Sequence, residues 1–159
     1  MLDTCVYIDV LQNRTSKGVD GLLASRVCHH SSVCLSELTH AFGRLDPKHP
    51  GTASALDNIR QTIQKMPPQR LHVPDASAWG QAGMVAGELA RRSGLQSRHM
   101  GESKYLKDAL IACQARMIGA SVLTANIQDF DFISQILKGV QVLFYRWPEV
   151  VALRDRRGC

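Results

Sequence analysis

The sequence predicts an α/β fold in which a mainly parallel sheet is covered by helices on both faces. Short segments rich in Val, Ile and Leu alternate along the chain with longer segments whose apolar residues recur at helical spacing. Most of the strand-like segments are continuous apolar runs, which is typical of parallel strands buried on both faces. No internal repeat or low-complexity segment interrupts the alternation, so we expect a single domain.

The N-terminal part is expected to contain two strands separated by a helix. Residues 2–11 open with strand-type residues, and Asp3 follows this first strand. Apolar residues at helical spacing predict a helix over residues 18–26. β-Branched and short polar residues at 27–35 favour a second, short strand.

Two further helices are expected before the middle of the chain. Ser36 is a good N-cap residue and Glu37 would lie in the first turn, so a helix is predicted over 36–45. Residues 46–51 contain two prolines and a glycine and form a loop. A second helical pattern covers 53–66, and the two prolines that follow end it.

The C-terminal half continues the alternation of strands and helices. A short strand is expected at 70–74, and Asp75 then caps a helix that extends to about residue 93. Residues 96–103 are polar and are expected to form a loop. The remaining predicted elements are a helix over 106–119, a buried strand over 121–124, a short helix over 129–137 and a last strand over 140–145.

The composition is that of a globular protein with a basic excess. Of the 159 residues, 45% are hydrophobic and 21% are charged, and the net charge is +5. A basic excess on a small domain favours a polyanionic partner such as a nucleic acid. No run of eighteen apolar residues and no basic leader segment is present, so we expect a cytoplasmic protein without membrane contact. Five cysteines without a CxxC pair predict reduced thiols.

Acidic and amide side chains are predicted to gather at the carboxyl ends of the strands, where ligands bind in open parallel sheets. These side chains are Asp3, Glu37, Asp108, Asn126 and Asp129. Convergent carboxylates repel one another unless they are protonated or bridged by a cation. An all-oxygen set suits Mg²⁺ or Mn²⁺ better than zinc. A divalent ion among acids on a basic protein suggests phosphodiester hydrolysis by a metal-activated water.

Each of these side chains also has a structural interpretation. Asp108 can complement a helix dipole at a helix start, and Glu37 can close the first turn of its helix. Asn126 and Asp129 can be turn and N-cap residues. Asp3 is harder to explain in this way, because Asp is depleted in strands and is costly among Val and Ile neighbours.

Three segments of the chain resemble the signature blocks of the PIN-domain ribonucleases, and more closely the VapC toxins of bacterial type II toxin–antitoxin systems. They are "LDTCVYID", "SSVCLSELTHAFGRL" and "KDALIACQARMIGASVLTANIQDF". The similarity extends over residues 2–145. It implies a PIN-like three-layer α/β/α sandwich in a single nuclease domain over 1–150, followed by a basic tail at 151–159.

The resemblance also implies an activity and a ligand set. Asp3, Glu37 and Asp108 match the metal-binding acids of the family, and the fourth position is either Asn126 or Asp129. The implied activity is that of a Mg²⁺- or Mn²⁺-dependent endoribonuclease in the bacterial cytoplasm. The implied assembly is a homodimer with a cognate VapB-like antitoxin that occludes the site.

Other residues are candidates for supporting roles. Thr4, Ser36 and Thr124 are positioned to contact the ligands or a water. Candidates to line an RNA path, with solvated surface as the alternative, are Arg91, Arg92, Arg98, Lys104 and Lys107. The chain departs from the family at two positions. Cys5 stands where Asn is usual, and a thiol is a poor donor; Asn126 stands where many relatives carry Asp, which would weaken a second metal.

Competing interpretations come from other classes of protein and site. One is a catalytically inactive PIN-like module that binds RNA or protein, and another is a phosphatase for small substrates, although the chain lacks a D-x-D-x-T motif. Two Cys and two His in "CHHSSVC" are possible zinc ligands, but their spacing fits no standard pattern and favours a strand and loop. Gly80, Gly83 and Gly87 share a helical face, which indicates close packing or, less favoured, a dimer contact.

Overall fold

The computed structural model describes residues 1–92 and 99–145, with only the backbone considered for residues 99–104. The described chain is a mixed α/β structure in which helices predominate. None of the helices within this part of the chain is both long and apolar enough to cross a membrane. The predicted tail at 151–159 lies outside the described residues.

Helices and strands alternate along most of the chain. The helices are α1 (Thr4–Leu11), α2 (Lys17–Ser25), α3 (Ser32–Arg44), α4 (Thr52–Gln64), α5 (Ala76–Arg92), α6 (His99–Met117) and α7 (Ile127–Ile136), with a short 3-10 helix η1 (Pro68–Arg70). The strands are β1 (His30–Ser31), β2 (Leu71–His72), β3 (Ser121–Thr124) and β4 (Gln141–Phe144).

The strands form two parallel pairs, β1 with β2 and β3 with β4. The first three residues connect the two pairs. The Leu2 amide donates to the His29 carbonyl at 3.0 Å, and the Asp3 amide donates to the Leu123 carbonyl at 3.1 Å. Leu2 also forms an isolated parallel bridge with Leu123. The parallel direction that the sequence predicts is therefore present, and Asp3 lies between the two pairs.

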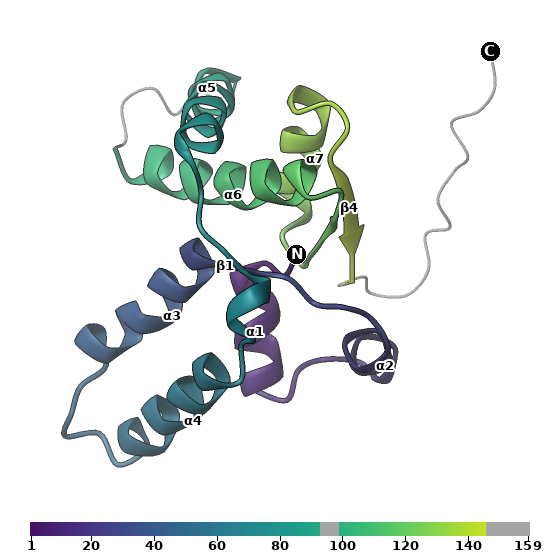
Figure 1. Ribbon diagram of the computed structural model, residues 1–159. Helices are drawn as coiled ribbons and strands as arrows, with labels where there is room; N and C mark the ends of the chain where they lie inside the picture. The colour runs from purple at the N-terminus through teal and green to yellow at the C-terminus, as the bar shows by residue number, and fades with distance from the viewer. Residues whose placement is uncertain (93–98, 146–159) are drawn as a thin grey trace.

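Helices lie on both sides of the strands. Figure 1 shows α5, α6 and α7 together on one side, and α1, α2, α3 and α4 on the other. Because the regular strands have only two to four residues, they do not build one continuous sheet. The predicted full three-layer sandwich around a central sheet therefore stays a prediction.

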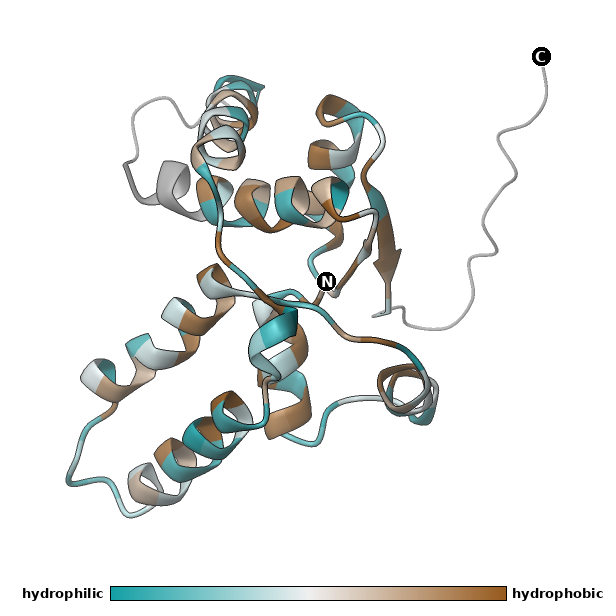
Figure 2. Ribbon diagram, in the orientation of Figure 1, coloured by the Kyte–Doolittle hydropathy of each residue, from teal (hydrophilic) through white to brown (hydrophobic). Residues whose placement is uncertain are grey.

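The core is centred on α6. Six of its residues are at most 1% exposed, and they occupy more than one side of the helix: Ala109, Leu110, Ile111, Ala112, Cys113 and Ala115. Val122 of β3 and Phe130 and Ile133 of α7 are also fully buried. The other helices show both hydrophobic and hydrophilic stretches in Figure 2, as expected of amphipathic helices that cover a core.

Several helix ends are fixed by polar caps. The Asp75 carboxylate accepts from the Ala78 amide at 2.8 Å at the start of α5, as predicted. The Asn126 side chain caps α7 by accepting from the Asp129 amide. Gly119 has φ +66°, a left-handed conformation that favours glycine and that follows the end of α6.

Four boundary predictions are wrong. Residues 4–11 are helical, so the first strand is reduced to the bridge at Leu2. Ser31, not Ser36, caps α3, because its hydroxyl accepts from the Val33 amide at 3.1 Å. Glu37 consequently lies in the second turn, and not in the first. Residues 99–103 are helical and not part of a loop, so Asp108 lies well inside α6 and does not cap a helix start.

Close packing does not explain the glycines of α5. Gly80, Gly83 and Gly87 are exposed, and a Cβ added at any of them would meet no atom within 4 Å. The predicted requirement for close packing within the chain is therefore wrong for these positions.

Replacing Phe130 with Ala should lower the free energy of unfolding by about 3–5 kcal/mol, because its ring is fully buried in the hydrophobic core. The matched control is Phe132→Ala on the same helix, where the ring is 43% exposed and the loss should be at most about 1 kcal/mol. Urea denaturation of both variants measures the difference. Equal losses would contradict the central place of α7 in the core.

Candidate functional site

Asp3 is buried directly after Leu2, the residue that bridges to Leu123, and it caps α1. Its side chain is held by three donors, and the residue is only 4% exposed. It accepts from the Thr4 amide at 2.7 Å, from the Cys5 thiol at 2.9 Å and from the Thr124 hydroxyl at 2.6 Å. These bonds fix both carboxylate oxygens relative to the start of α1 and the end of β3.

Burial has a cost for the charged form of Asp3. Desolvation raises the pKa of its carboxyl group, and the charge of Glu37 adds to this rise. The hydrogen bonds from Cys5, Thr124 and Thr4 act in the opposite direction. Asp3 is therefore a carboxylate whose negative charge is incompletely compensated by the groups around it.

Asp108 and Asp129 meet at a single amide group. The Asn126 Nδ2 atom donates to Asp108 Oδ2 at 3.1 Å and to Asp129 Oδ2 at 2.8 Å. Asp108 is 8% exposed and Asp129 is 5% exposed. The structure thus brings α6 and the start of α7 together through two buried carboxylates, and it places both candidates for the fourth position, Asn126 and Asp129, beside Asp108.

Glu37 belongs to the same group of acids but is more accessible. Its side chain is 26% exposed. One carboxylate oxygen accepts from the Thr4 hydroxyl at 2.5 Å, and the other lies 3.1 Å from the Lys107 ammonium nitrogen. Glu37 therefore joins α3 to both α1 and α6.

These contacts, together with the neighbouring positions of Lys107 and Asp108 in α6, connect the acids into one set, which we call the carboxylate ring. The Thr124 hydroxyl accepts from the backbone amide of Asn126 at 2.9 Å and donates to Asp3. It therefore connects Asp3 to Asp108 and Asp129, which the Asn126 side chain binds. In order around the ring, the members are Asp3, Thr4, Glu37, Lys107, Asp108, Asn126 and Thr124, with Asp129 attached at Asn126. The residues that the sequence places at strand ends are thus brought together.

The donor set of the carboxylate ring fits a hard divalent cation. Its carboxylate, amide and hydroxyl groups offer the oxygen ligands that Mg²⁺ and Mn²⁺ prefer, and the raised pKa of Asp3 reflects a charge that a cation would stabilise. Within residues 1–92 and 105–145, no three His, Cys, Asp or Glu side chains lie in an arrangement recognised as a metal site. Amide and ammonium groups between the carboxylates hold them in their present positions.

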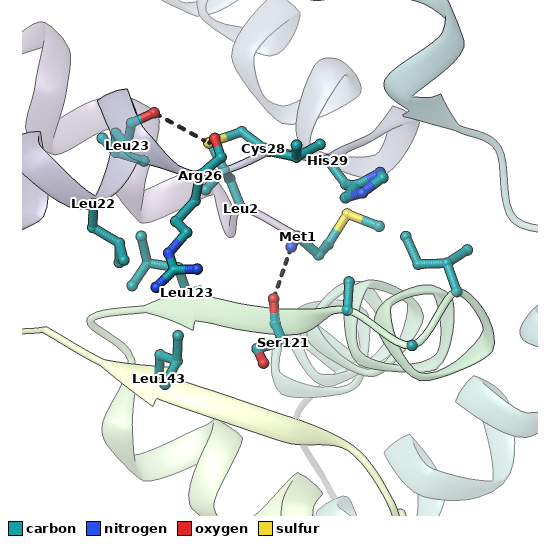
Figure 3. Close-up of a pocket in the computed structure, with 14 residues that line it drawn as sticks. Met1, Leu2, Leu22, Leu23, Arg26, Cys28, His29, Ser121, Leu123 and Leu143 are labelled. Carbon is teal, nitrogen blue, oxygen red and sulfur yellow. Dashed lines mark hydrogen bonds between the residues drawn. The ribbon is translucent and has the colours of Figure 1, made fainter.

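A cavity lies along β3 and β4. It has a volume of about 440 Å³ and is lined by Met1, His29, Ser121 and Leu143, among others (Figure 3). The residues that line it include no member of the carboxylate ring, so this cavity is separate from the ring.

Comparisons with known proteins show a similarity of fold. No model of a protein family and no curated protein matches the sequence. Among solved structures, a chain of DNA-bound VapBC from Salmonella typhimurium is 26% identical with a TM-score of 0.61, and the match covers 92% of this chain and 97% of that one.

Two further solved structures are similar. A chain of VapBC2 from Rickettsia felis, bound to a promoter DNA fragment, is 17% identical with a TM-score of 0.62 and matches over 92% of this chain and 98% of that one. A chain of VapBC-1 from nontypeable Haemophilus influenzae is 22% identical with a TM-score of 0.56, over 91% and 96%. The chain is VapC-like. Its resemblance to a PIN-domain toxin, inferred from three sequence blocks, extends to the fold of nearly the whole chain.

The three candidates for supporting roles in this VapC-like chain differ in outcome. Thr4 and Thr124 are members of the carboxylate ring. Ser36 is exposed, and its hydroxyl donates to the Val33 carbonyl at 2.8 Å within α3. Because Ser36 is neither the cap of α3 nor a ring member, the sequence assigned it too large a role.

The basic candidates are only partly accounted for. Arg92 pairs with Glu88 at 2.6 Å, and Arg91 lies 3.9 Å from the same carboxylate, so both are engaged on the surface of α5. Lys107 pairs with Glu37 and is part of the carboxylate ring. Arg98 and the side chain of Lys104 lie outside the described residues.

Cys5 is a donor to Asp3 in the candidate site, a role that sequence reasoning undervalued. Burial, followed by the charge of Asp3, raises the pKa of the Cys5 thiol to about 11. The thiol consequently keeps its proton at neutral pH and donates it to Asp3, while the Ala125 amide donates to its sulfur at 3.2 Å. Its position two residues after Asp3 was the available signal.

A second buried acid on α1 was not singled out by sequence reasoning. Asp9 is 1% exposed, accepts from the Tyr145 hydroxyl at 2.7 Å and lies 3.1 Å from an Arg14 nitrogen. It ties α1 to the residue that follows β4. An acid within an otherwise apolar helical segment was the signal that could have found it.

Asp3→Asn should stabilise the metal-free protein at neutral pH. Since the pKa of Asp3 is raised by folding, the folded protein binds this proton more tightly than the unfolded chain does, and the charged form lowers stability above the raised pKa. Asn keeps the N-cap acceptor but carries no charge. The advantage of the variant should shrink as the pH falls, which urea denaturation in EDTA at several pH values measures.

The control for this experiment is Asp131→Asn, which removes an exposed carboxylate from α7. It should change stability little at any pH. A wild-type protein that is more stable than Asp3→Asn across the whole pH range would show that the bonds to the carboxylate outweigh its desolvation.

Proposed function

We propose that the chain is a Mg²⁺- or Mn²⁺-dependent endoribonuclease and the toxin of a VapBC-type pair. The observation that carries the proposal is the carboxylate ring, in which the buried acids Asp3, Asp108 and Asp129 are tied to Glu37 at the carboxyl ends of parallel strands. The VapC-like fold supports it independently.

Asp3, Glu37, Asp108 and Asp129 would hold the cation, with Asn126 as an additional oxygen ligand. A bound divalent ion polarises the scissile phosphate and lowers the pKa of a bound water, so that the water can attack in line without a free 2′-OH. The chain's own part is to fix the carboxylates. Thr124 orients Asp3, and Asn126 keeps Asp108 and Asp129 together.

Lys107 serves the site as a resident positive charge. Its ammonium group lies 3.1 Å from Glu37 and its side chain is 42% exposed, so it can turn towards solvent. A positive charge at the rim of an acidic site lowers the repulsion that a phosphate would otherwise meet. Lys107 would exchange its contact with Glu37 for one with an RNA phosphate.

An exposed aromatic side chain lines the same groove as this lysine. Trp79 is 51% exposed. Together with Lys107, Ser36 and Pro74 it lines a groove of about 350 Å³. An indole face beside a cation offers stacking and charge for single-stranded RNA, so this groove is the approach we assign to the substrate.

The antitoxin would bind in a second groove, on the other side of Glu37. This groove, of about 510 Å³, lies between α1, α3 and α4 and has a mainly apolar lining. Ile8, Leu11 and Ala41 contribute to its apolar wall, while Thr4 and Glu37 reach its edge. An amphipathic VapB-like segment fits such a groove and would cover the accessible side of the carboxylate ring.

A homodimer is supported by the outer face of α5. Gly80, Gly83 and Gly87 leave open space there, and Met84 is 71% exposed beside them. Small residues with an exposed Met between them permit close approach of a second helix. We therefore assign this face to a second copy of the chain.

A catalytically inactive binding module is the second candidate. The observation that favours it is that Lys107 and Asn126 already compensate the acids without a metal. Such a module would bind RNA equally well in the presence of Mg²⁺ and of EDTA, whereas the nuclease requires the ion.

Asp108→Asn should reduce RNA cleavage by on the order of 100-fold or more while the protein remains folded, because a ligand charge is lost and the shape is kept. The measurement is cleavage of total cellular RNA by antitoxin-free protein with Mg²⁺, with Mn²⁺ and with EDTA. Asp131→Asn on α7 is the control and should cleave normally. Fragments that form in EDTA, or undiminished cleavage by Asp108→Asn, would refute the proposed mechanism.

Asn126→Asp should raise the affinity for Mn²⁺ by about tenfold or more, because a carboxylate replaces a neutral ligand among the ring acids. The same change should lower the stability of the metal-free protein, since three carboxylates would then meet without the amide donor. Isothermal titration and thermal unfolding measure the two effects. Asn58→Asp, on the exposed side of α4, should show neither.

A further inference from the structure

Two histidines from neighbouring strands face each other outside the carboxylate ring. His29 immediately precedes β1, and His72 ends β2. The parallel register pairs His30 with Leu71 and Ser31 with His72, so His29 and His72 lie on the same face of the pair. His29 Nδ1 and His72 Nε2 are 2.9 Å apart and share a hydrogen bond in which one ring donates and the other accepts, so a metal ion would replace this proton.

The two rings are close to the geometry of a metal chelate. With zinc–nitrogen bonds of 2.0–2.1 Å and a tetrahedral angle, two imidazole nitrogens lie about 3.3 Å apart and their ring centres about 5 Å apart. The observed ring centroids are 5.1 Å apart, with an interplanar angle of 47°. If the His29 and His72 nitrogens moved a few tenths of an ångström further apart while the ring centres stayed in place, an ion could bind between them.

The surroundings keep at least one ring available as a ligand. Desolvation, followed by the positive charges near it, lowers the pKa of His29; those charges are on His72, the Met1 amino group and Arg70. A lowered pKa favours the neutral imidazole, which is the form that binds metals. His29 also lines the cavity of about 440 Å³ shown in Figure 3, so water can reach it and complete the coordination.

The other potential ligands of this segment have different partners. His30 Nδ1 lies 2.6 Å from the Tyr7 hydroxyl. The Cys28 thiol is directed to the carbonyl groups of Leu23 and Arg26, each at 3.7 Å. The "CHHSSVC" segment forms a loop, strand β1 and the first residues of α3, so the strand and loop interpretation is confirmed only up to Ser31. His29 gains its partner from β2.

We propose that His29 and His72 form a binding site for a divalent transition-metal ion such as Zn²⁺, separate from the carboxylate ring. Imidazole ligands suit Zn²⁺, Ni²⁺ and Cu²⁺, whereas Mg²⁺ prefers the oxygens of the carboxylate ring. A bound ion would tie β1 to β2 directly before α3, the helix that Ser31 caps and that carries Glu37.

The test is titration of untagged protein with Zn²⁺, measured by isothermal calorimetry in the presence of excess Mg²⁺ and a non-thiol reductant. Thermal unfolding with and without Zn²⁺ is the second measurement. Zn²⁺ should bind at one site and raise the unfolding temperature. His72→Ala and His29→Ala should each weaken binding by about tenfold or more and remove the thermal shift. His40→Ala, which removes an exposed histidine from α3, is the matched control and should bind as the wild type does.

Undiminished Zn²⁺ affinity in His72→Ala would overturn the proposal. Because either variant could also fail to fold, the wild-type protein supplies an independent reading. Nuclear magnetic resonance during the titration should show the ring signals of His29 and His72 shifting first. Initial shifts confined to other histidines, or to none, would equally overturn it.

Discussion

The fully buried hydroxyl of Thr124 is the interaction on which the candidate site depends. Thr124 is the last residue of β3, and its hydroxyl donates to Asp3 at 2.6 Å and accepts from the backbone amide of Asn126 at 2.9 Å. One group thus fixes a carboxylate from the start of the chain and the turn that caps α7. A hydroxyl can do both because it is donor and acceptor at once. The residue at the end of one buried strand thus fixes the positions of acids from different parts of the chain.

Burial of several acids creates an electrostatic problem that the chain solves with neutral and positive donors. The Asn126 amide lies between Asp108 and Asp129, the Cys5 thiol and Thr124 bind Asp3, and Lys107 faces Glu37. These donors compensate the charges without neutralising all of them, and the raised pKa of Asp3 is the sign of this. A site of this kind gains most from a divalent cation, since the ion supplies charge that hydrogen bonds do not.

The sequence predicted those parts of the fold and site that depend on local pattern. The strand Ser121–Thr124 was placed correctly, because a short apolar run between a helix and a polar turn has few alternatives. The start of α3 was not: Ser31 and Ser36 are both competent caps, and it is Ser31, the last residue of β1, that caps the helix. The contacts of Glu37 with Thr4 and Lys107 span 33 and 70 residues of sequence, and no local signal encodes them.

The carboxylate ring has a fixed side and an adjustable side. Asp3, Asp108 and Asp129 are at most 8% exposed and are held by Thr124 and Asn126. Glu37 is longer and 26% exposed, and it is held by one hydroxyl and by the ammonium group of Lys107, whose side chain is 42% exposed. Both grooves that we assign to partners meet this adjustable side, one through Lys107 and the other through Thr4 and Glu37. A segment bound in the apolar groove would therefore displace Glu37, the most exposed of the four acids. The buried acids would keep their positions, so the site would be complete again once the segment dissociates.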